Sequence, residues 1–168
     1  MAQHIINTSG EKSPVVYTSK KWKSFYQSFC TNRNNTDSLN MPIFDKYTNI
    51  YTLCCVIGFK EGRRTSLDSR ESLFTLEQLD QNEEWPLLLS VAWLSSNRDL
   101  SLFGDTKEIL NICSEYAETG IEILANTYPI NELFKNGALI TNKEPEDFKH
   151  DLLTAIAALK ADYLDEII

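Results

Sequence analysis

The chain has 168 residues, of which 42% are hydrophobic and 24% are charged, and its formal net charge is −8. These values are typical of a globular protein and exclude disorder along most of the length. No run of residues approaches the roughly 20 apolar positions needed to span a bilayer, and the amino terminus lacks the basic start and apolar segment of a secretion signal. We therefore expect a cytoplasmic protein without a membrane partner.

The first half of the chain shows local signals for two helices. Its expected elements are, in order, a flexible tail (1–13), a short strand (14–18), a helix (19–30), a loop (31–42) and a helix (about 45–59). Ser19 is a candidate N-cap for the first helix. Gly62 is expected to end the second helix in the left-handed conformation, and Gly58 within it is better tolerated where another backbone packs against it.

The second half predicts three more helices. Its expected elements are a strand or irregular segment (73–76), a helix (83–96), a helix (105–128) and a final helix that begins near residue 144. The 83–96 helix is hydrophobic almost all round, so we expect it to be the most buried. Asp105 and Glu108 resemble a capping box at the start of the next helix. Gly120 is expected where two helices cross closely.

These elements predict a mainly α fold. Residues 14–168 should form a single domain, a bundle of about five helices that could also include two or three short strands. We expect one core that contains, from the last three helices, Trp85, Leu89, Trp93, Ile112, Tyr116, Leu124 and Ile156.

No pattern of catalytic or metal-binding residues stands out. The four cysteines include no C-x-x-C, and the only histidines are His4 and His150, so no zinc spacing exists and buried reduced thiols are expected. Glu115, Glu118 and Glu122 share a helical spacing, but the E-x-x-H partners of a di-iron bundle are absent, which favours a solvated acidic face. We expect no cofactor, no metal ion and no enzymatic activity, with a metal-dependent enzyme in a novel fold as the alternative.

Positive and negative charges are unevenly distributed along the chain. Residues 1–70 hold ten Lys and Arg against five acids, a net +5, whereas residues 71–168 hold six against nineteen, a net −13. Such asymmetry indicates nucleic-acid contact or a partner with its own charged face, unless folding brings the halves together. Contact with DNA is expected on the first half only, because the acidic half would repel it.

The densest group of cations follows the 45–59 helix and comprises Lys60, Arg63 and Arg64. Cations stabilise the C-terminal end of a helix and could pair with acids of the second half. Arginines on a glycine-bounded turn could instead bind phosphate or a partner's carboxylate through forked hydrogen bonds. We predict that at least one of the three contacts a partner while the others pair with acids. A secondary basic patch is expected at Lys20, Lys21 and Lys23.

Two motifs carry a family resemblance. The first is the apolar helix that leads into Gly58, Lys60, Gly62, Arg63 and Arg64, and the second is the segment SEYAETGIEIL at residues 114–124. In order and spacing, residues 44–128 resemble the DNA phosphorothioation-associated protein 4 family, also called Dnd system-associated protein 4. The resemblance implies a place in bacterial systems that put sulfur into the DNA backbone and restrict unmarked invading DNA, and it supplies no catalytic residues to transfer.

The resemblance and the residues together predict a non-catalytic accessory or regulatory subunit of an anti-phage DNA modification and restriction system. It would act by protein–protein contact with a larger ATPase or nuclease, and it would reach DNA through that complex. One alternative is a component that binds DNA directly through the basic first half. Another is an acidic DNA mimic that regulates a nuclease.

Overall fold

The structure is a computed structural model, and it describes residues 12–30, 44, 46–127, 134–135, 138–139, 150, 153–154 and 157. The elements are, in chain order, β1 (Val15–Ser19), α1 (Lys20–Phe29), α2 (Tyr47–Glu61), β2 (Arg70–Thr75), the 3-10 helix η1 (Leu76–Gln78), α3 (Glu84–Ser95), the 3-10 helix η2 (Leu100–Gly104), α4 (Thr106–Asn126), β3 (Phe134–Lys135) and β4 (Ala138–Leu139). The mainly helical fold class is therefore confirmed.

Local signals explain the two longest helices. Asp105 accepts a hydrogen bond from the Glu108 backbone N–H at 3.0 Å, and so caps α4 as expected. Gly62 ends α2 with a φ of 71°, and its N–H donates to the Phe59 carbonyl at 3.0 Å. Only glycine adopts this left-handed conformation without strain, which is why the helix stops there.

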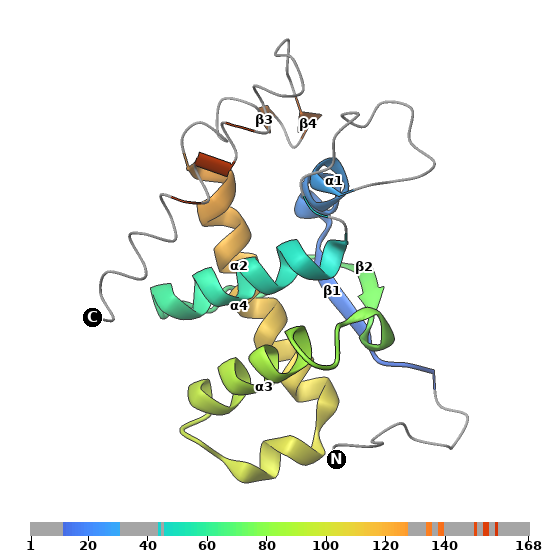
Figure 1. The fold of residues 1–168 in the computed structure, drawn as a ribbon, viewed down its shortest axis with the longest axis vertical. Helices are drawn as coiled ribbons and strands as arrows, with labels where there is room; N and C mark the ends of the chain where they lie inside the picture. The colour runs from blue at the N-terminus through green and yellow to red at the C-terminus, as the bar shows by residue number, and fades with distance from the viewer. Residues whose placement is uncertain are drawn as a thin grey trace.

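The centre of the fold is the crossing of α2 and α4 (Figure 1). A Cβ atom on Gly120 would lie 2.8 Å from the Cα of Cys54, and one on Gly58 would lie 2.8 Å from the carbonyl carbon of Tyr116. Each glycine thus faces the backbone of the other helix, and a side chain at either position would push the helices apart. The expected close crossing at Gly120 is confirmed.

A two-stranded antiparallel sheet, β1 with β2, packs beside this crossing (Figure 1). Val16 and Phe74 are opposite each other in the register and both are buried. The ring of Phe74 meets that of Tyr51 from α2 edge-on, with 5.1 Å between the centroids. The sheet therefore closes one side of the helical core, and the expected strand over 14–18 is confirmed within one residue.

The expectation that the 83–96 helix is the most buried is wrong. In α3, only Glu84, Leu88, Val91 and Ala92 are buried, while Leu87 and Leu94 keep exposed fractions of 43% and 44%. The helix is apolar all round, but it packs on α2 and α4 through one face, and the other face has no covering element among the described residues.

The predicted core residues of α4 are buried, whereas those of α3 are only partly buried. Ile112, Tyr116 and Leu124 are buried, whereas Trp85 and Leu89 pack partly buried at its margin. Trp93 is half-buried. Ile156, the 31–42 loop, most of the final helix and most of the predicted tail lie outside the described residues. Within the described part of the chain, no helix is both long and apolar enough to cross a membrane.

Candidate functional site

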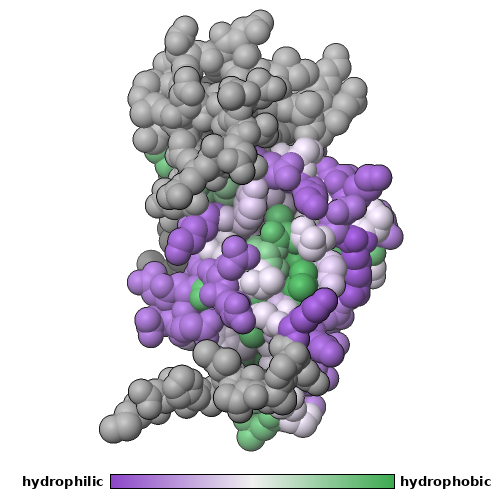
Figure 2. Space-filling view, turned by 90° about the vertical axis from the view of Figure 1, so that its right-hand side faces the viewer, coloured by the Kyte–Doolittle hydropathy of each residue, from purple (hydrophilic) through white to green (hydrophobic). Residues whose placement is uncertain are grey.

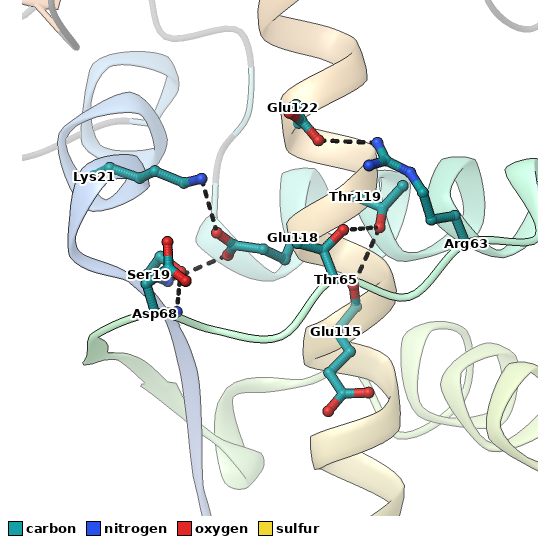
Figure 3. Close-up of polar contacts among 9 residues, drawn as sticks. All are labelled: Ser19, Lys21, Arg63, Thr65, Asp68, Glu115, Glu118, Thr119 and Glu122. Carbon is teal, nitrogen blue, oxygen red and sulfur yellow. Dashed lines mark hydrogen bonds and ion pairs between the residues drawn. The ribbon is translucent and has the colours of Figure 1, made fainter.

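The turn that follows α2, residues 62–65, lies against α4 and is called the arginine turn below. The backbone N–H of Thr65 donates to the Glu115 carbonyl at 3.1 Å, and the Thr65 hydroxyl lies 2.8 Å from that of Thr119. Figure 3 shows Thr65 and Arg63 facing α4. The glycine that ends α2 directs the chain back along α4, so local sequence and tertiary contact fix the same turn.

The two adjacent arginines bind two different acids of α4. Arg63 Nη2 donates to Glu122 Oε2 at 2.9 Å. Arg64 donates to a single oxygen of Glu115 through both Nε, at 2.7 Å, and Nη2, at 2.6 Å. The two acids are seven residues apart, about two turns of helix, so neighbouring side chains reach them only by pointing in opposite directions along α4.

The two ion pairs differ in how well they are shielded. Arg63 keeps 53% of its side-chain surface exposed, against 38% for Arg64, and Glu122 is twice as exposed as Glu115, at 40% against 20%. The guanidinium of Arg64 also lies 5.9 Å from the centroid of the Tyr116 ring, a cation–π contact. Exposed ion pairs contribute about 0–1 kcal/mol to stability, so the contribution of Arg64 should be the larger of the two.

Glu118 points away from the arginine turn, toward the junction of β1 and α1 (Figure 3). Only 2% of the residue is exposed, and its Oε2 accepts a hydrogen bond from the Ser19 N–H at 3.3 Å. The ammonium of Lys21 lies 3.8 Å from Oε1, which has no hydrogen-bond partner of its own. Burial raises the pKa of Glu118 above its usual value of 4.5, although the hydrogen bonds from Ser19 and the charge of Lys21 lower it.

The expectation of a solvated acidic face on α4 is therefore wrong. Glu115, Glu118 and Glu122 bind cations that lie 51 to 97 residues earlier in the chain, as their numbers show. The helical spacing correctly places the three acids along one helix, but it carries no information about partners so distant. Among the described residues, no group of three or more His, Cys, Asp or Glu is arranged to hold a metal ion.

The junction also changes the role expected for Ser19. It occupies the N-cap position of α1, but its side chain makes no bond to that helix. Its hydroxyl instead accepts from the Asp68 N–H at 3.3 Å, while its own N–H donates to Glu118. Ser19 thus ties α1, α4 and the segment before β2 together (Figure 3).

The other predicted cations are spread over the molecule. Lys60 is exposed in the last turn of α2, and Lys20 is exposed at the start of α1. Lys21 lies 5.2 Å from the centroid of the Trp22 ring as well as near Glu118. Lys23 pairs with Glu71 at 3.2 Å.

Folding brings the basic and acidic halves together. Four ion pairs among the described residues each join a cation of residues 1–70 to an acid of residues 71–168. The predicted pairing of the turn with acids of the second half is confirmed for Arg63 and Arg64. The binding of a partner or a phosphate by Lys60, Arg63 and Arg64, or by the patch at Lys20, Lys21 and Lys23, stays a prediction.

Sequence reasoning missed four large hydrophobic residues that are exposed on α3 and η2. They are Leu87, Leu94, Leu100 and Phe103, and are together called the apolar ridge. Leu100 is 70% exposed and Phe103 is 45% exposed. The described part of the chain has six exposed large hydrophobic residues, and four of them belong to the apolar ridge. The sequence signal for this surface is the all-round apolar character of the 83–96 segment, which also fits a helix with one uncovered face.

Local contacts hold the end of this ridge in place. Asn97 and Arg98 both have positive φ angles, 56° and 65°, and the guanidinium of Arg98 lies 6.0 Å from the centroid of the Trp93 ring. Asp99 then caps η2 by accepting from the Ser101 N–H at 2.9 Å, and Leu102 is buried. Leu100 and Phe103 are therefore exposed on an anchored segment.

Comparison with known families identifies the chain. A model of the family described as DNA sulphur modification system-associated protein 4 matches residues 21–151, most of the chain. The chain belongs to this family. The matched range includes the arginine turn, the apolar ridge and all of α4, and it confirms the resemblance drawn from the two motifs. No curated protein and no solved structure gave a match.

Proposed function

We propose that this member of the DNA sulphur modification system-associated protein 4 family is a non-catalytic accessory or regulatory subunit of a bacterial anti-phage modification and restriction system. It acts by protein–protein contact, with a larger ATPase or nuclease of that system as its partner. The observation that carries the proposal is the apolar ridge. Docking can bury only the 43–70% of each residue that is still exposed, so each contributes about 0.6–2 kcal/mol, and the ridge favours a protein partner.

The charges also favour protein contact over direct DNA contact. A protein that binds the DNA backbone needs several cations that are free to neutralise phosphates. Arg63, Arg64, Lys21 and Lys23 each have a carboxylate within ion-pair distance, and the protein carries a net charge of −8. A phosphate would have to displace an acid at each of these positions.

The non-catalytic part of the proposal is supported by what the buried reactive groups do. Glu84 accepts hydrogen bonds from the Asn49 side chain and the Asp80 N–H, both at 2.8 Å. The thiol of Cys113 donates to the Leu88 carbonyl at 3.4 Å. Both groups link separate elements of the fold, which is a structural role.

Hydrophobic residues are also visible at the lower end of the molecule in Figure 2, the end at which Figure 1 places α3. A second hydrophobic area, no smaller than the one at the lower end, lies in the middle of this face among pale and hydrophilic residues. The test of the proposal is directed at the α3–η2 end, because four large hydrophobic residues of those two helices are exposed.

The experiment is co-expression of the tagged full chain with the other proteins of its DNA sulphur modification system, followed by purification through the tag. The double variant Leu100→Ser with Phe103→Ser should fold normally by circular dichroism, because both side chains are exposed, and should lose the co-purifying ATPase or nuclease. The matched control is Leu153→Ser, another exposed leucine at 49%, which should retain it. A folded ridge variant that retains its partner as the control does would refute the proposal.

A second pair of variants tests the arginine turn in the same assay. Arg63→Gln and Arg64→Gln remove charge without placing a new carboxylate beside Glu122 or Glu115. If a folded variant no longer co-purifies the partner, the substituted arginine contacts that partner, as predicted for at least one cation of the turn. Titration of the isolated protein with duplex DNA completes the design, since strong salt-dependent binding would favour the direct DNA-binding alternative over protein contact.

A further inference from the structure

A cavity of about 220 Å³ lies between the β1–β2 sheet and the first turns of α4. It is lined by residues of β1, the segment before β2, β2 itself and α4, among them Tyr17, Leu67, Arg70, Lys107, Leu110 and Asn111. Two cations and no carboxylate are among its lining residues, in a protein whose net charge is −8. This cavity is thus a positively charged site on an acidic protein.

Arg70 is exposed and contacts a neutral partner at the cavity. Its Nη2 donates to the side-chain oxygen of Asn111 at 2.9 Å. The contact leaves the Asn111 amide nitrogen as a hydrogen-bond donor. No carboxylate lies within ion-pair distance of Arg70 among the described residues, in contrast to Arg63 and Arg64.

Lys107 occupies a position that the fold itself does not favour. It is the second residue of α4, and the start of a helix carries partial positive charge, which disfavours a cation. Lys107 is exposed and makes no ion pair with the described residues. Asp105, which caps the helix, does not line the cavity. An anion in the cavity would be attracted by Lys107 and by Arg70 together.

We infer that this cavity binds a phosphomonoester group attached to a small organic body. A guanidinium fork and a separate ammonium group match a doubly charged phosphate better than a single carboxylate, which one arginine can satisfy alone. The cavity holds roughly seven times the volume of one liquid water molecule, so a bare anion leaves most of it unfilled. Tyr17, Leu67 and Leu110 provide apolar surface for the remainder of the ligand.

The size of the cavity limits the ligand class. Sites for drug-sized ligands measure about 300–1,000 Å³, and this cavity is smaller. A mononucleotide or a sugar phosphate that is partly exposed to solvent is the expected scale. The ring of Tyr17, 37% exposed at the cavity, could stack against a planar base. The nucleotide could be free in solution or could be the 5′-phosphorylated end of a DNA strand.

The first experiment measures binding to the full chain by nuclear magnetic resonance. The probes are inorganic phosphate, thymidine 5′-monophosphate and thymidine. Phosphate and the nucleotide should shift the Asn111 side-chain amide and the Arg70 Nε signals, and the nucleotide should bind about tenfold or more tightly than thymidine, because the charge-assisted bonds are lost without the phosphate. Absence of binding by both anions up to about 10 mM would overturn the inference.

The second experiment uses a matched pair of lysine variants. Lys107→Gln should weaken nucleotide binding about tenfold, whereas Lys46→Gln, which removes the same charge from another exposed lysine, should leave it unchanged. Equal weakening in both variants would mean that only net charge matters and would overturn the inference. Arg70→Gln should act like Lys107→Gln, and thermal unfolding checks that each variant is folded.

A third comparison separates the two sources of the phosphate. A short single strand of DNA is supplied with either a 5′-phosphate or a 5′-hydroxyl. If the wild type binds the phosphorylated strand more tightly than the hydroxyl strand, and Lys107→Gln binds both equally, the site is assigned to a DNA end. Binding of the mononucleotide with no preference between the strands would assign it to a free small ligand. Equal binding of wild type and Lys107→Gln to every probe would overturn the inference for both sources.

Discussion

The crossing of α2 and α4 makes Gly120 sensitive to the addition of any side chain. In the variant Gly120→Ala, the new methyl group would lie 2.8 Å from the Cα of Cys54 and closer still to its carbonyl group. These are backbone atoms in the middle of a helix, so they cannot rotate away as a side chain could. The two helices must separate locally, and the contacts around the crossing must loosen.

The expected size of the effect follows from two opposing contributions. Alanine in place of glycine would by itself stabilise a helix by about 1 kcal/mol. Overpacking of a tight interior contact costs typically about 1–3 kcal/mol and occasionally more, and a backbone obstacle places this case at the upper end. We expect a net loss of about 2 kcal/mol, which corresponds to a Tm lower by about 4–8 °C for a chain of this length.

The assay is urea and thermal unfolding of the wild type and Gly120→Ala, with Gly104→Ala as the control. No heavy atom lies within 4 Å of a Cβ on Gly104, so its free energy of unfolding should change by less than about 0.5 kcal/mol. Gly58→Ala meets the Tyr116 backbone across the same crossing. The double variant should therefore lose less than the sum of the single losses, because the first methyl group already separates the helices. A Gly120→Ala protein as stable as the wild type, or more stable, would refute this reasoning.

Two further outcomes are expected from the buried ionisable groups. Because burial raises the pKa of Glu118 above its usual 4.5, the folded protein holds this proton more tightly than the unfolded chain. The stability of the wild type should then fall relative to that of Glu118→Gln as the pH rises from about 4.5 through the folded pKa, and parallel stability curves between about pH 4 and pH 7 would contradict this. All four cysteines are buried, and burial raises the pKa of Cys30 to about 12 and that of Cys54 above its usual value. The native protein should resist a thiol reagent at neutral pH and react fully in urea, and rapid modification of the native thiols would show that the core opens more readily than the structure indicates.

Local sequence alone determined where α4 begins and where α2 ends. The Asp105 cap, the left-handed Gly62 and the prediction that Gly120 marks a close crossing are all correct. Each of these depends on forces that act within one turn of helix, or on the single property that glycine has no side chain. The two family motifs correspond to the arginine turn, with the end of α2 that precedes it, and to the part of α4 against which this turn packs.

Only the tertiary structure decided which faces of the helices are covered and which charges meet. Glu118 belongs to a regular helical spacing of acids, yet it is buried because Ser19, 99 positions away, donates to it and Lys21 lies beside it. The 83–96 helix is apolar all round, but its exposure depends on how many neighbours reach it, and Leu87 and Leu94 remain at the surface. Burial and ion pairing are properties of segments brought together by the fold. Periodicity within one segment specifies a face, and the packing of the whole chain decides what that face contacts.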